Sequence, residues 1–244
     1  MSQGKTCGKR CAFLYKALTT TPLFRGYNAA EVEKICGLLK ARLKHYAARA
    51  IVVHECMAVK DLFVVISGKV VSSICGLTED RRHQLMYSIP GDLIGSAFPE
   101  MRLEGYPFLM TAVEPSEILH LDVEAARELI RSPEYGTLLR NMLNLSGRRC
   151  VQAVRKLAVM SCYETSDRIL LYLRHHYEDT GDRLLAFKRT ELAEYLGVNR
   201  TALYRSITKL VESGAIRASR GKLELLTVAG QSKCNYGQVK CTVV

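Results

Sequence analysis

Two arginines in the C-terminal third of the chain have the side chain and the spacing to read the edges of DNA base pairs. Arg200 and Arg205 lie in a segment of helical periodicity that begins just after Asn199. A guanidinium donates two parallel hydrogen bonds to O6 and N7 of guanine, and each such contact discriminates against a wrong base by ~1–3 kcal/mol. Thr201 can contact a thymine methyl group or a phosphate. The sequence therefore predicts a base-reading surface made of Arg200, Thr201 and Arg205.

A second set of polar side chains is suited to hold the phosphates of the same DNA. Such contacts come from basic, hydroxyl and amide groups and from helix N-termini, and they fix a protein's register on the duplex. The residues expected in this role are Arg189, Thr190, Asn199, Tyr204, Arg220 and Lys222. The charge distribution agrees, because residues 140–244 carry 18 Lys and Arg against 9 Asp and Glu, whereas residues 61–139 carry 6 against 12. This pattern indicates a polyanion-binding module joined to a domain of another kind.

A helix-turn-helix is predicted to position these side chains. A first helix, capped by Thr190, is expected before Gly197, which suits the tight turn between two helices. Asn199 is expected to cap the second helix. The residues that would face inward recur at helical spacing: Leu192, Ala193, Leu196, Leu203, Ile207 and Leu210. Residues 217–226 alternate around a Ser-Arg-Gly-Lys turn, which predicts a β-hairpin wing.

The pattern changes in the N-terminal half. Residues 10–49 read as helical, with Asn28 as a cap and apolar residues at helical spacing as far as Leu43. Residues 50–122 contain short β-rich runs separated by turn signals, which predict a small antiparallel sandwich or roll. A short helix is expected near residues 123–131.

A long helix is predicted at about residues 134–160. Leu138, Met142 and Leu145 begin an apolar stripe that steps by threes and fours, as in a helix that pairs with another helix. The stripe is longer than one small roll needs. We therefore expect these three residues to form the interface of a homodimer.

Composition excludes several classes of protein. The chain has 244 residues, 48% of them hydrophobic, which argues against intrinsic disorder. No stretch approaches the roughly 18 uninterrupted apolar residues of a membrane span, and no apolar segment of signal-peptide length follows the N-terminus. We expect a cytoplasmic globular protein that does not enter membranes. The nine cysteines do not read as a disulfide framework, and Cys7 and Cys11 are weak candidates for metal ligands.

From about residue 18 to residue 228 the chain resembles the cyclic-AMP receptor protein/fumarate-nitrate reduction regulator (Crp/Fnr) superfamily of bacterial transcription factors. The order and spacing of the matching pieces make the resemblance specific. These pieces are Thr21-Pro22-Leu23-Phe24, Leu62-Phe63-Val64-Val65-Ile66-Ser67-Gly68-Lys69-Val70, Pro90-Gly91-Asp92-Leu93-Ile94-Gly95 and Asn199-Arg200-Thr201-Ala202-Leu203-Tyr204-Arg205. The resemblance carries over Arg200, Thr201 and Arg205 as base-contacting positions, with Thr201 where a glutamate is common.

The resemblance implies an α+β fold with a cyclic-nucleotide-binding-type β-roll, a long dimerisation helix and a C-terminal winged helix-turn-helix. The expected boundaries are 1–131 for the effector-sensing roll domain with its N-terminal helices, 132–160 for the dimerisation helix and 161–228 for the DNA-binding domain. Residues 229–244 are expected to be a disordered tail. The expected partners are double-stranded DNA with palindromic half-sites, a second copy of the chain, RNA polymerase and a small-molecule effector.

Cyclic AMP is disfavoured as that effector. Relatives that bind it hold the phosphate with Gly-Glu, followed about ten residues later by Arg-Ser or Arg-Thr, whereas this chain has Gly95-Ser96 and then Tyr106-Pro107-Phe108. We expect a small organic ligand in the roll instead. The residues expected to line its pocket are Ile94, Gly95, Ser96, Ala97, Tyr106 and Phe108.

Other sensor chemistries and another class of protein stay open at this point. An iron–sulfur cluster would use Cys7 and Cys11 with a distant cysteine, and haem would use a histidine in or beside the roll. Thiol oxidation is a further alternative. A ligand-binding protein or enzyme with an incidental basic module is the competing class. No catalytic residues are expected, because the sequence contains no supported Ser-His-Asp arrangement, phosphate-binding Gly-rich loop or metal-ligand cluster.

Overall fold

The computed structural model describes residues 14–75, 82–101 and 103–226. The chain divides into two compact units, Met1–Val154 and Arg155–Val244. Each unit has its own hydrophobic core, one within the roll and one among the C-terminal helices. The α+β fold class and the predicted order of roll, long helix and helix-turn-helix are confirmed. No described helix combines the length and the apolar character that a membrane span requires.

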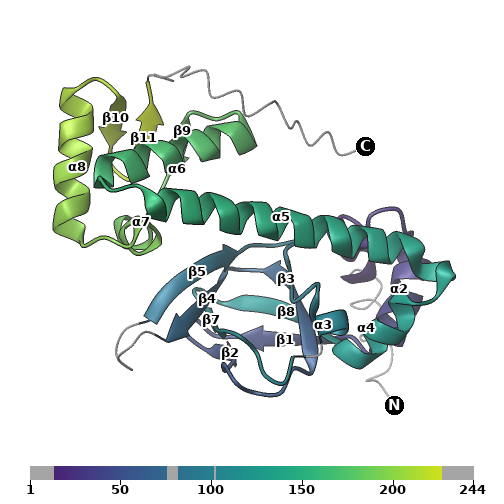
Figure 1. The fold of residues 1–244 in the computed structure, drawn as a ribbon. Coiled ribbons are helices and arrows are strands. Elements are labelled where there is room, and N and C mark those ends of the chain that lie inside the picture. The colour runs from purple at the N-terminus through teal and green to yellow at the C-terminus, as the bar shows by residue number, and fades with distance from the viewer. Residues whose placement is uncertain (1–13, 76–81, 102, 227–244) are drawn as a thin grey trace, which may run out of the picture. The chain divides into compact units, whose positions relative to one another are not determined.

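The N-terminal unit is built on two antiparallel four-stranded sheets (Figure 1). One sheet has the order β1 (Arg42–Tyr46), β8 (Ser116–Asp122), β3 (Asp61–Ser67) and β6 (Leu93–Ile94). The other has the order β2 (Ile51–Val53), β7 (Leu109–Ala112), β4 (Val70–Cys75) and β5 (Arg82–Ser88). The sheets bury a core that includes Phe63, Met110 and Leu121, so this half of the chain is the predicted roll.

Short helices accompany the roll. They are η1 (Pro22–Phe24), α2 (Ala29–Leu38), α3 (Phe98–Met101), α4 (Val123–Ile130) and η2 (Pro133–Tyr135). Asn28 caps α2 as predicted, because its side-chain oxygen accepts hydrogen bonds from the backbone N–H groups of Ala30 and Glu31 at 3.0 Å. Asp122 caps α4 by accepting from the N–H of Ala125 at 2.8 Å.

The prediction that residues 10–49 are helical throughout is wrong at its end. Arg42 to Tyr46 form β1, whose partner β8 lies more than 70 residues further along the chain. Leu43 stands opposite Leu119 in this pairing and packs against the roll core. Its apolar spacing therefore belongs to a sheet face, which helical periodicity cannot distinguish over so short a run.

The long helix α5 (Gly136–Ser161) confirms the predicted helix but changes the role of its first stripe. Leu138, Met142 and Leu145 are only 1%, 4% and 6% exposed, and they belong to the roll core of the same chain. These side chains are not available to a second copy, so their assignment to a dimer interface is corrected. Further along, the half-buried Arg149 lies against β5 and donates to the carbonyl of Tyr87 at 3.2 Å.

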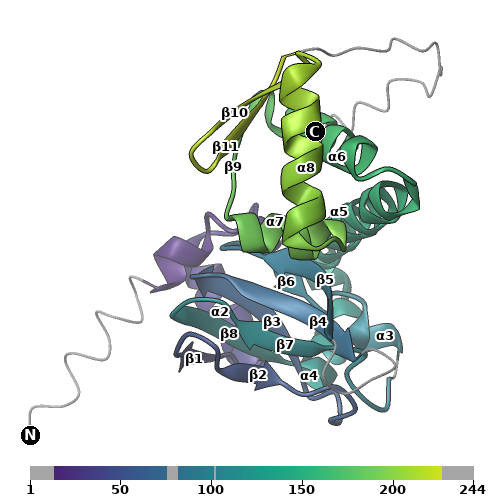
Figure 2. The ribbon, with the colours of Figure 1, turned by 90° about the vertical axis from the view of Figure 1, so that its left-hand side faces the viewer.

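The C-terminal unit combines four helices with a small sheet. After the last turns of α5 come α6 (Thr165–Thr180), α7 (Arg189–Leu196) and α8 (Arg200–Glu212). The three antiparallel strands have the order β10 (Ile216–Ser219), β11 (Lys222–Leu225) and β9 (Leu184–Ala186). Figure 2 shows the hairpin of β10 and β11 beside α8. The predicted wing is therefore present, with β9 as an additional strand.

Candidate nucleic-acid interface and ligand cavity

The turn between α7 and α8 depends on Gly197. Its backbone is left-handed, with φ +65°, a conformation that side chains disfavour. A Cβ atom at this position would also lie 2.7 Å from Cε of Met160, in the last turn of α5. Val159 is fully buried in the same core. The end of the long helix therefore packs directly against the turn of the helix-turn-helix.

Of the two caps predicted for the helix-turn-helix, one is confirmed and one is wrong. Asn199 caps α8 as expected, because its side-chain oxygen accepts from the N–H of Ala202 at 2.7 Å. The amide nitrogen of Asn199 then remains for a phosphate. Thr190 does not cap α7, since Lys188 holds the cap position in extended backbone without a side-chain hydrogen bond. Thr190 lies inside the first turn, where the helix N-terminus can still present backbone donors to a phosphate.

The three predicted base-reading side chains are exposed at the beginning of α8. Arg205 follows Thr201 by one helical turn, so the two residues share a face, and Arg200 is the first residue of the helix. The inward face carries Leu203 and Leu210, which are buried as predicted. Neither Arg200 nor Arg205 forms an ion pair with any residue that the structure describes. Their guanidinium donors are therefore left to an external acceptor.

Arg189 and Tyr204 interact with each other, which the sequence did not indicate. The guanidinium of Arg189 donates a hydrogen bond to the Tyr204 hydroxyl and lies 4.8 Å from the centre of its ring. The contact joins the first residue of α7 to the exposed face of α8. Both residues were predicted as separate phosphate contacts, and the structure brings them together as a pair that can approach one phosphate.

The wing presents two further cations. Arg220 is exposed in the turn between β10 and β11, and Lys222 is exposed as the first residue of β11. The hairpin is held by the ion pair between Arg217 and Glu224 at 2.6 Å, and the N–H of Phe187 donates to the carbonyl of Gly221 at 2.9 Å. These contacts join the two strands of the hairpin and tie its tip to Phe187, just before α7.

The residues predicted to line an effector pocket lie in a filled part of the roll. Tyr106 is 4% exposed, and its hydroxyl accepts from the N–H of Asp61 at 2.9 Å. The rings of Tyr106, Phe98 and Phe108 pack together, with centroids 5.9–6.4 Å apart. Gly95 has φ +83°, and a Cβ there would overlap the ring of Phe98. The remaining predicted residues vary in exposure: Ile94 is buried, Ser96 is half-buried and Ala97 is exposed.

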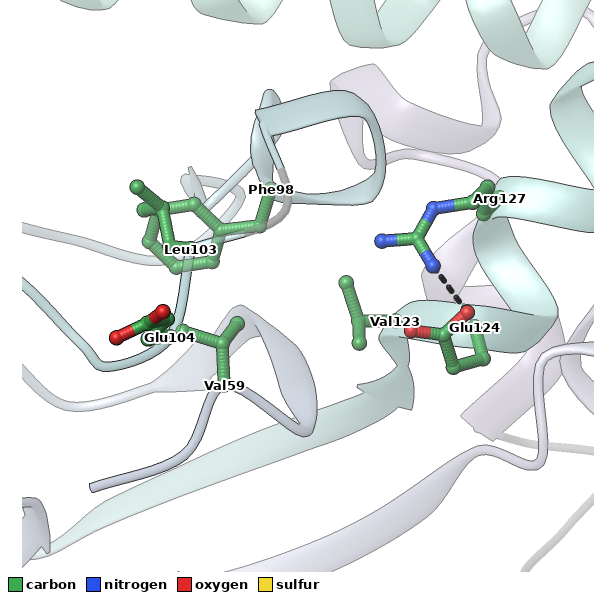
Figure 3. A pocket seen from close by; sticks show the side chains of 7 residues that line it. All are labelled: Val59, Phe98, Leu103, Glu104, Val123, Glu124 and Arg127. Atoms are coloured by element: carbon green, nitrogen blue, oxygen red, sulfur yellow. Dashed lines mark hydrogen bonds and ion pairs between the residues drawn. The ribbon is translucent and has the colours of Figure 1, made fainter.

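A cavity of about 410 Å³ adjoins this aromatic group at Phe98, beside α3 and α4 (Figure 3). Its lining residues are Val59, Phe98, Leu103, Glu104, Val123, Glu124 and Arg127. None of the six predicted pocket residues is among them. The signal available in the sequence was Glu124 three residues before Arg127 on the predicted helix 123–131, a spacing at which opposite charges pair.

A polar network links β1, β8 and β3 in the first of the two sheets of the roll. Nδ1 of His120 lies 3.0 Å from Oδ2 of Asp61, and its Nε2 lies 2.9 Å from the hydroxyl of Tyr46. Arg42 pairs with the same carboxylate. Burial raises the pKa of Asp61, but the hydrogen bond with His120 and the charge of Arg42 outweigh it, so the pKa is below its ordinary value. His120 is thus engaged on both ring nitrogens.

Metal-ligand groups are absent from the described residues, since no three His, Cys, Asp or Glu side chains gather there as a potential site. Cys7 and Cys11 lie outside the described residues. Cys36 is buried, and desolvation raises the pKa of its thiol to about 12, which keeps it protonated.

Comparison with known proteins identifies the C-terminal unit and the fold. Residues 168–230 match the model of the Crp-like helix-turn-helix domain. The chain is 26% identical to the nitrogen fixation regulation protein FixK of Bradyrhizobium diazoefficiens, over 87% of this chain and 89% of that protein.

Solved structures agree on the architecture. The c-di-GMP responsive global regulator CLP of Xanthomonas campestris matches with a TM-score of 0.65 at 20% identity, over 82% of this chain and 100% of that chain. FixK2 of Bradyrhizobium japonicum matches with a TM-score of 0.61 at 15% identity, over 77% of this chain and 93% of that chain. At these identities the structural likeness concerns the fold.

Proposed function

We propose that the chain is a transcription regulator of the Crp/Fnr superfamily, which binds palindromic DNA as a homodimer and responds to an effector other than cyclic AMP. The match of residues 168–230 to the Crp-like helix-turn-helix domain and the similarity to FixK support this proposal. The chain's place of action would be the cytoplasm, where it would meet DNA and RNA polymerase. The related proteins are regulators and not enzymes. We therefore propose that the chain binds DNA and an effector and catalyses no reaction.

The observation that carries the proposal is the outward face of α8. Arg200, Thr201 and Arg205 are exposed on a helix whose other face is buried, and it lies in the segment that matches a Crp-like helix-turn-helix domain. In such motifs the second helix enters the major groove and its N-terminal residues meet the base edges. The Arg189–Tyr204 pair, the amide of Asn199, the first turn of α7 at Thr190 and the wing cations Arg220 and Lys222 would then hold the flanking phosphates.

The proposed dimer uses the exposed side of α5. Leu143, Val154 and Leu157 are 63%, 60% and 67% exposed. Together with the exposed Gly147 and Cys150 they form a seam in which the spacing alternates between four and three residues. This is the repeat of a two-stranded coiled coil, in which each helix covers the seam of the other. A second copy of the chain is therefore the proposed occupant of the seam.

Regulation would act by a shift between two states of this dimer. An effector that binds one state more tightly favours it, whereas one that binds both states equally has no effect. The contact of Met160 with the turn at Gly197 gives a change in α5 a direct route to α8. The favoured state would present the two recognition helices to half-sites about one helical turn apart.

The test is selection of bound sequences from a random duplex library by the purified full-length chain, followed by footprinting. We expect an inverted repeat whose half-site centres lie about 10 base pairs apart, and protection of duplex DNA only. Enrichment of a single unrepeated site, or equal binding of single-stranded RNA, would contradict the proposal. The same preparation examined by light scattering reports whether the bound species contains two chains.

A further inference from the structure

The cavity beside α3 and α4 is lined by apolar and charged side chains. The apolar lining residues are Val59, Phe98, Leu103 and Val123, and Glu104 lies on the same side as Val59 and Leu103. Arg127 and Glu124 also line the cavity and pair with each other on α4. Its volume of about 410 Å³ lies in the range of roughly 300–1,000 Å³ typical of small-molecule sites. The ligand that fits such a space has an apolar body and a charged end.

Arg127 is placed to hold that charged end. Its side chain is only 12% exposed, and its Nε donates to the carbonyl of Pro99 while Nη1 donates to Glu124. A guanidinium has five N–H donors, so donors remain after these two bonds. Figure 3 shows the guanidinium directed into the space between Phe98 and Val123. The two existing bonds fix its orientation before any ligand arrives, which lowers the entropy lost on binding.

The charges around the cavity restrict the ligand further. Two carboxylates, Glu104 and Glu124, line it together with the one guanidinium. A ligand with only a carboxylate would reach Arg127 but would meet the like charge of Glu124 beside it. A ligand with only an ammonium group could pair with Glu104 or Glu124 but would leave the remaining donors of Arg127 without an acceptor. A zwitterion satisfies both partners, because its carboxylate can pair with Arg127 and its ammonium with Glu124.

We propose that this cavity is the effector site and that it binds an α-amino acid with an apolar side chain. The identification of the ligand as an effector rests on the proposed function, whereas binding itself does not. The α-carboxylate would accept from Arg127, the α-ammonium would donate to Glu124, and the side chain would lie against Phe98, Leu103, Val59 and Val123.

The position of the cavity gives the ligand a way to affect the long helix. α4 ends at Ile130, and α5 begins at Gly136 after the single turn of η2. A ligand that joins Phe98 on α3 to Arg127 on α4 would hold these two helices together. Phe98 also belongs to the aromatic group with Tyr106 and Phe108. A ligand bound between α3 and α4 would therefore affect both the aromatic group inside the roll and the segment that leads into α5.

The test is isothermal titration calorimetry of the full-length chain with L-leucine and L-phenylalanine. Three analogues separate the contributions: 4-methylpentanoate lacks the ammonium of leucine, 3-methylbutylamine lacks its carboxylate, and glycine lacks its apolar side chain. We expect at least one of the two amino acids to bind with a Kd of about 1 mM or lower, and each analogue at least about tenfold more weakly. Binding of neither amino acid, or equal affinity for 4-methylpentanoate, overturns the proposal.

Variants connect the binding to this cavity. Arg127→Gln should weaken the amino acid at least about tenfold, and Val59→Phe should abolish binding by filling the space while leaving the ion pair in place. Arg140→Gln is the control, because Arg140 is exposed on α5 in the same unit and does not line the cavity. Unchanged binding in both Arg127→Gln and Val59→Phe overturns the site.

DNA binding by the same preparations separates this inference from the proposed function. Wild-type protein that selects a palindrome but binds neither amino acid leaves the DNA-binding function standing and removes the effector site. Protein that binds leucine but no DNA leaves the amino-acid site standing and removes the proposed DNA-binding function. If both bind, we expect saturating amino acid to change the DNA affinity of the wild type and to leave that of Val59→Phe unchanged.

Discussion

At the scale of single residues, cations of equal charge are expected to contribute differently to DNA binding. Arg205 is exposed on α8, the helix that we propose enters the major groove, whereas Lys222 is exposed at the start of β11 in the wing. A base contact discriminates between sequences, while a phosphate contact adds affinity for all of them and depends on salt through release of counterions. Position relative to the groove, and not charge, therefore determines the effect of each.

Replacing each cation by alanine tests this difference. Arg205→Ala should cost ~1–3 kcal/mol on the preferred site and relax selection at one base position. Lys222→Ala should weaken binding to all sequences and lower the slope of log affinity against log salt by about 1. Titration of matched and mismatched duplexes at several salt concentrations measures both. Arg174→Ala, on α6 and paired with Glu178, is the control, and a pure salt effect in Arg205→Ala would refute its role in base reading.

At the scale of elements, α5 has two apolar stripes, one covered within its own chain and one exposed. One stripe, with Leu138 and Met142, closes the roll of its own chain. The other, the seam of Leu143, Gly147, Cys150, Val154 and Leu157, faces outward. A helix this exposed and this apolar on one side is stabilised mainly by packing against another element. The seam therefore explains why the helix extends beyond the roll.

A charge in the seam should separate the dimer. Val154→Glu combined with Leu157→Glu would bring four carboxylates together at the interface, so we expect a monomer in sedimentation experiments at concentrations where the wild type is dimeric. Gln152→Glu adds a charge on the exposed side of the same helix but outside the seam and should remain dimeric. A double variant that stays dimeric would place the interface elsewhere.

At the scale of the whole molecule, two separate cores predict two responses to acid. Asp61, whose pKa is lowered in the folded roll, contributes stability above its unfolded pKa of about 3.9. That contribution is lost as the pH falls from the unfolded pKa through the lower folded pKa, because in this range the unfolded chain binds the proton more readily than the folded chain. Only the N-terminal unit contains this group.

Asp61→Asn should therefore affect one unit. At neutral pH it should destabilise the roll by roughly 1–3 kcal/mol, because the charge-assisted hydrogen bond with His120 and the pair with Arg42 are lost. Between about pH 4 and more acid conditions the variant should lose less stability than the wild type. Hydrogen exchange followed separately in the two units measures this, and equal changes in both units would show that they unfold as one.

The sequence predicted most reliably what depends on local spacing. Gly197, Asn199 and the inward leucines determine the helix-turn-helix within about twenty residues, and the structure has it. The long helix was also predicted, but not which core would cover Leu138, since periodicity does not name the partner. Tyr106 and Phe108 were assigned to a pocket because they stand where relatives that bind cyclic AMP have Arg-Ser or Arg-Thr. Their packing against Phe98, and the cavity at Arg127, depend on contacts between distant segments.

The seam of α5 also bears on which chains can assemble together. Gly147 has open space where a side chain would begin, and nothing described lies within 4 Å of that point. Two identical helices can approach closely there, because each brings the same small residue. A related chain with a bulky residue at the corresponding position would hold the helices apart and leave Cys150 and Val154 poorly covered. In a cell that makes several related regulators, the seam would favour homodimers of this chain over mixed dimers. Each regulator would then respond to its own effector.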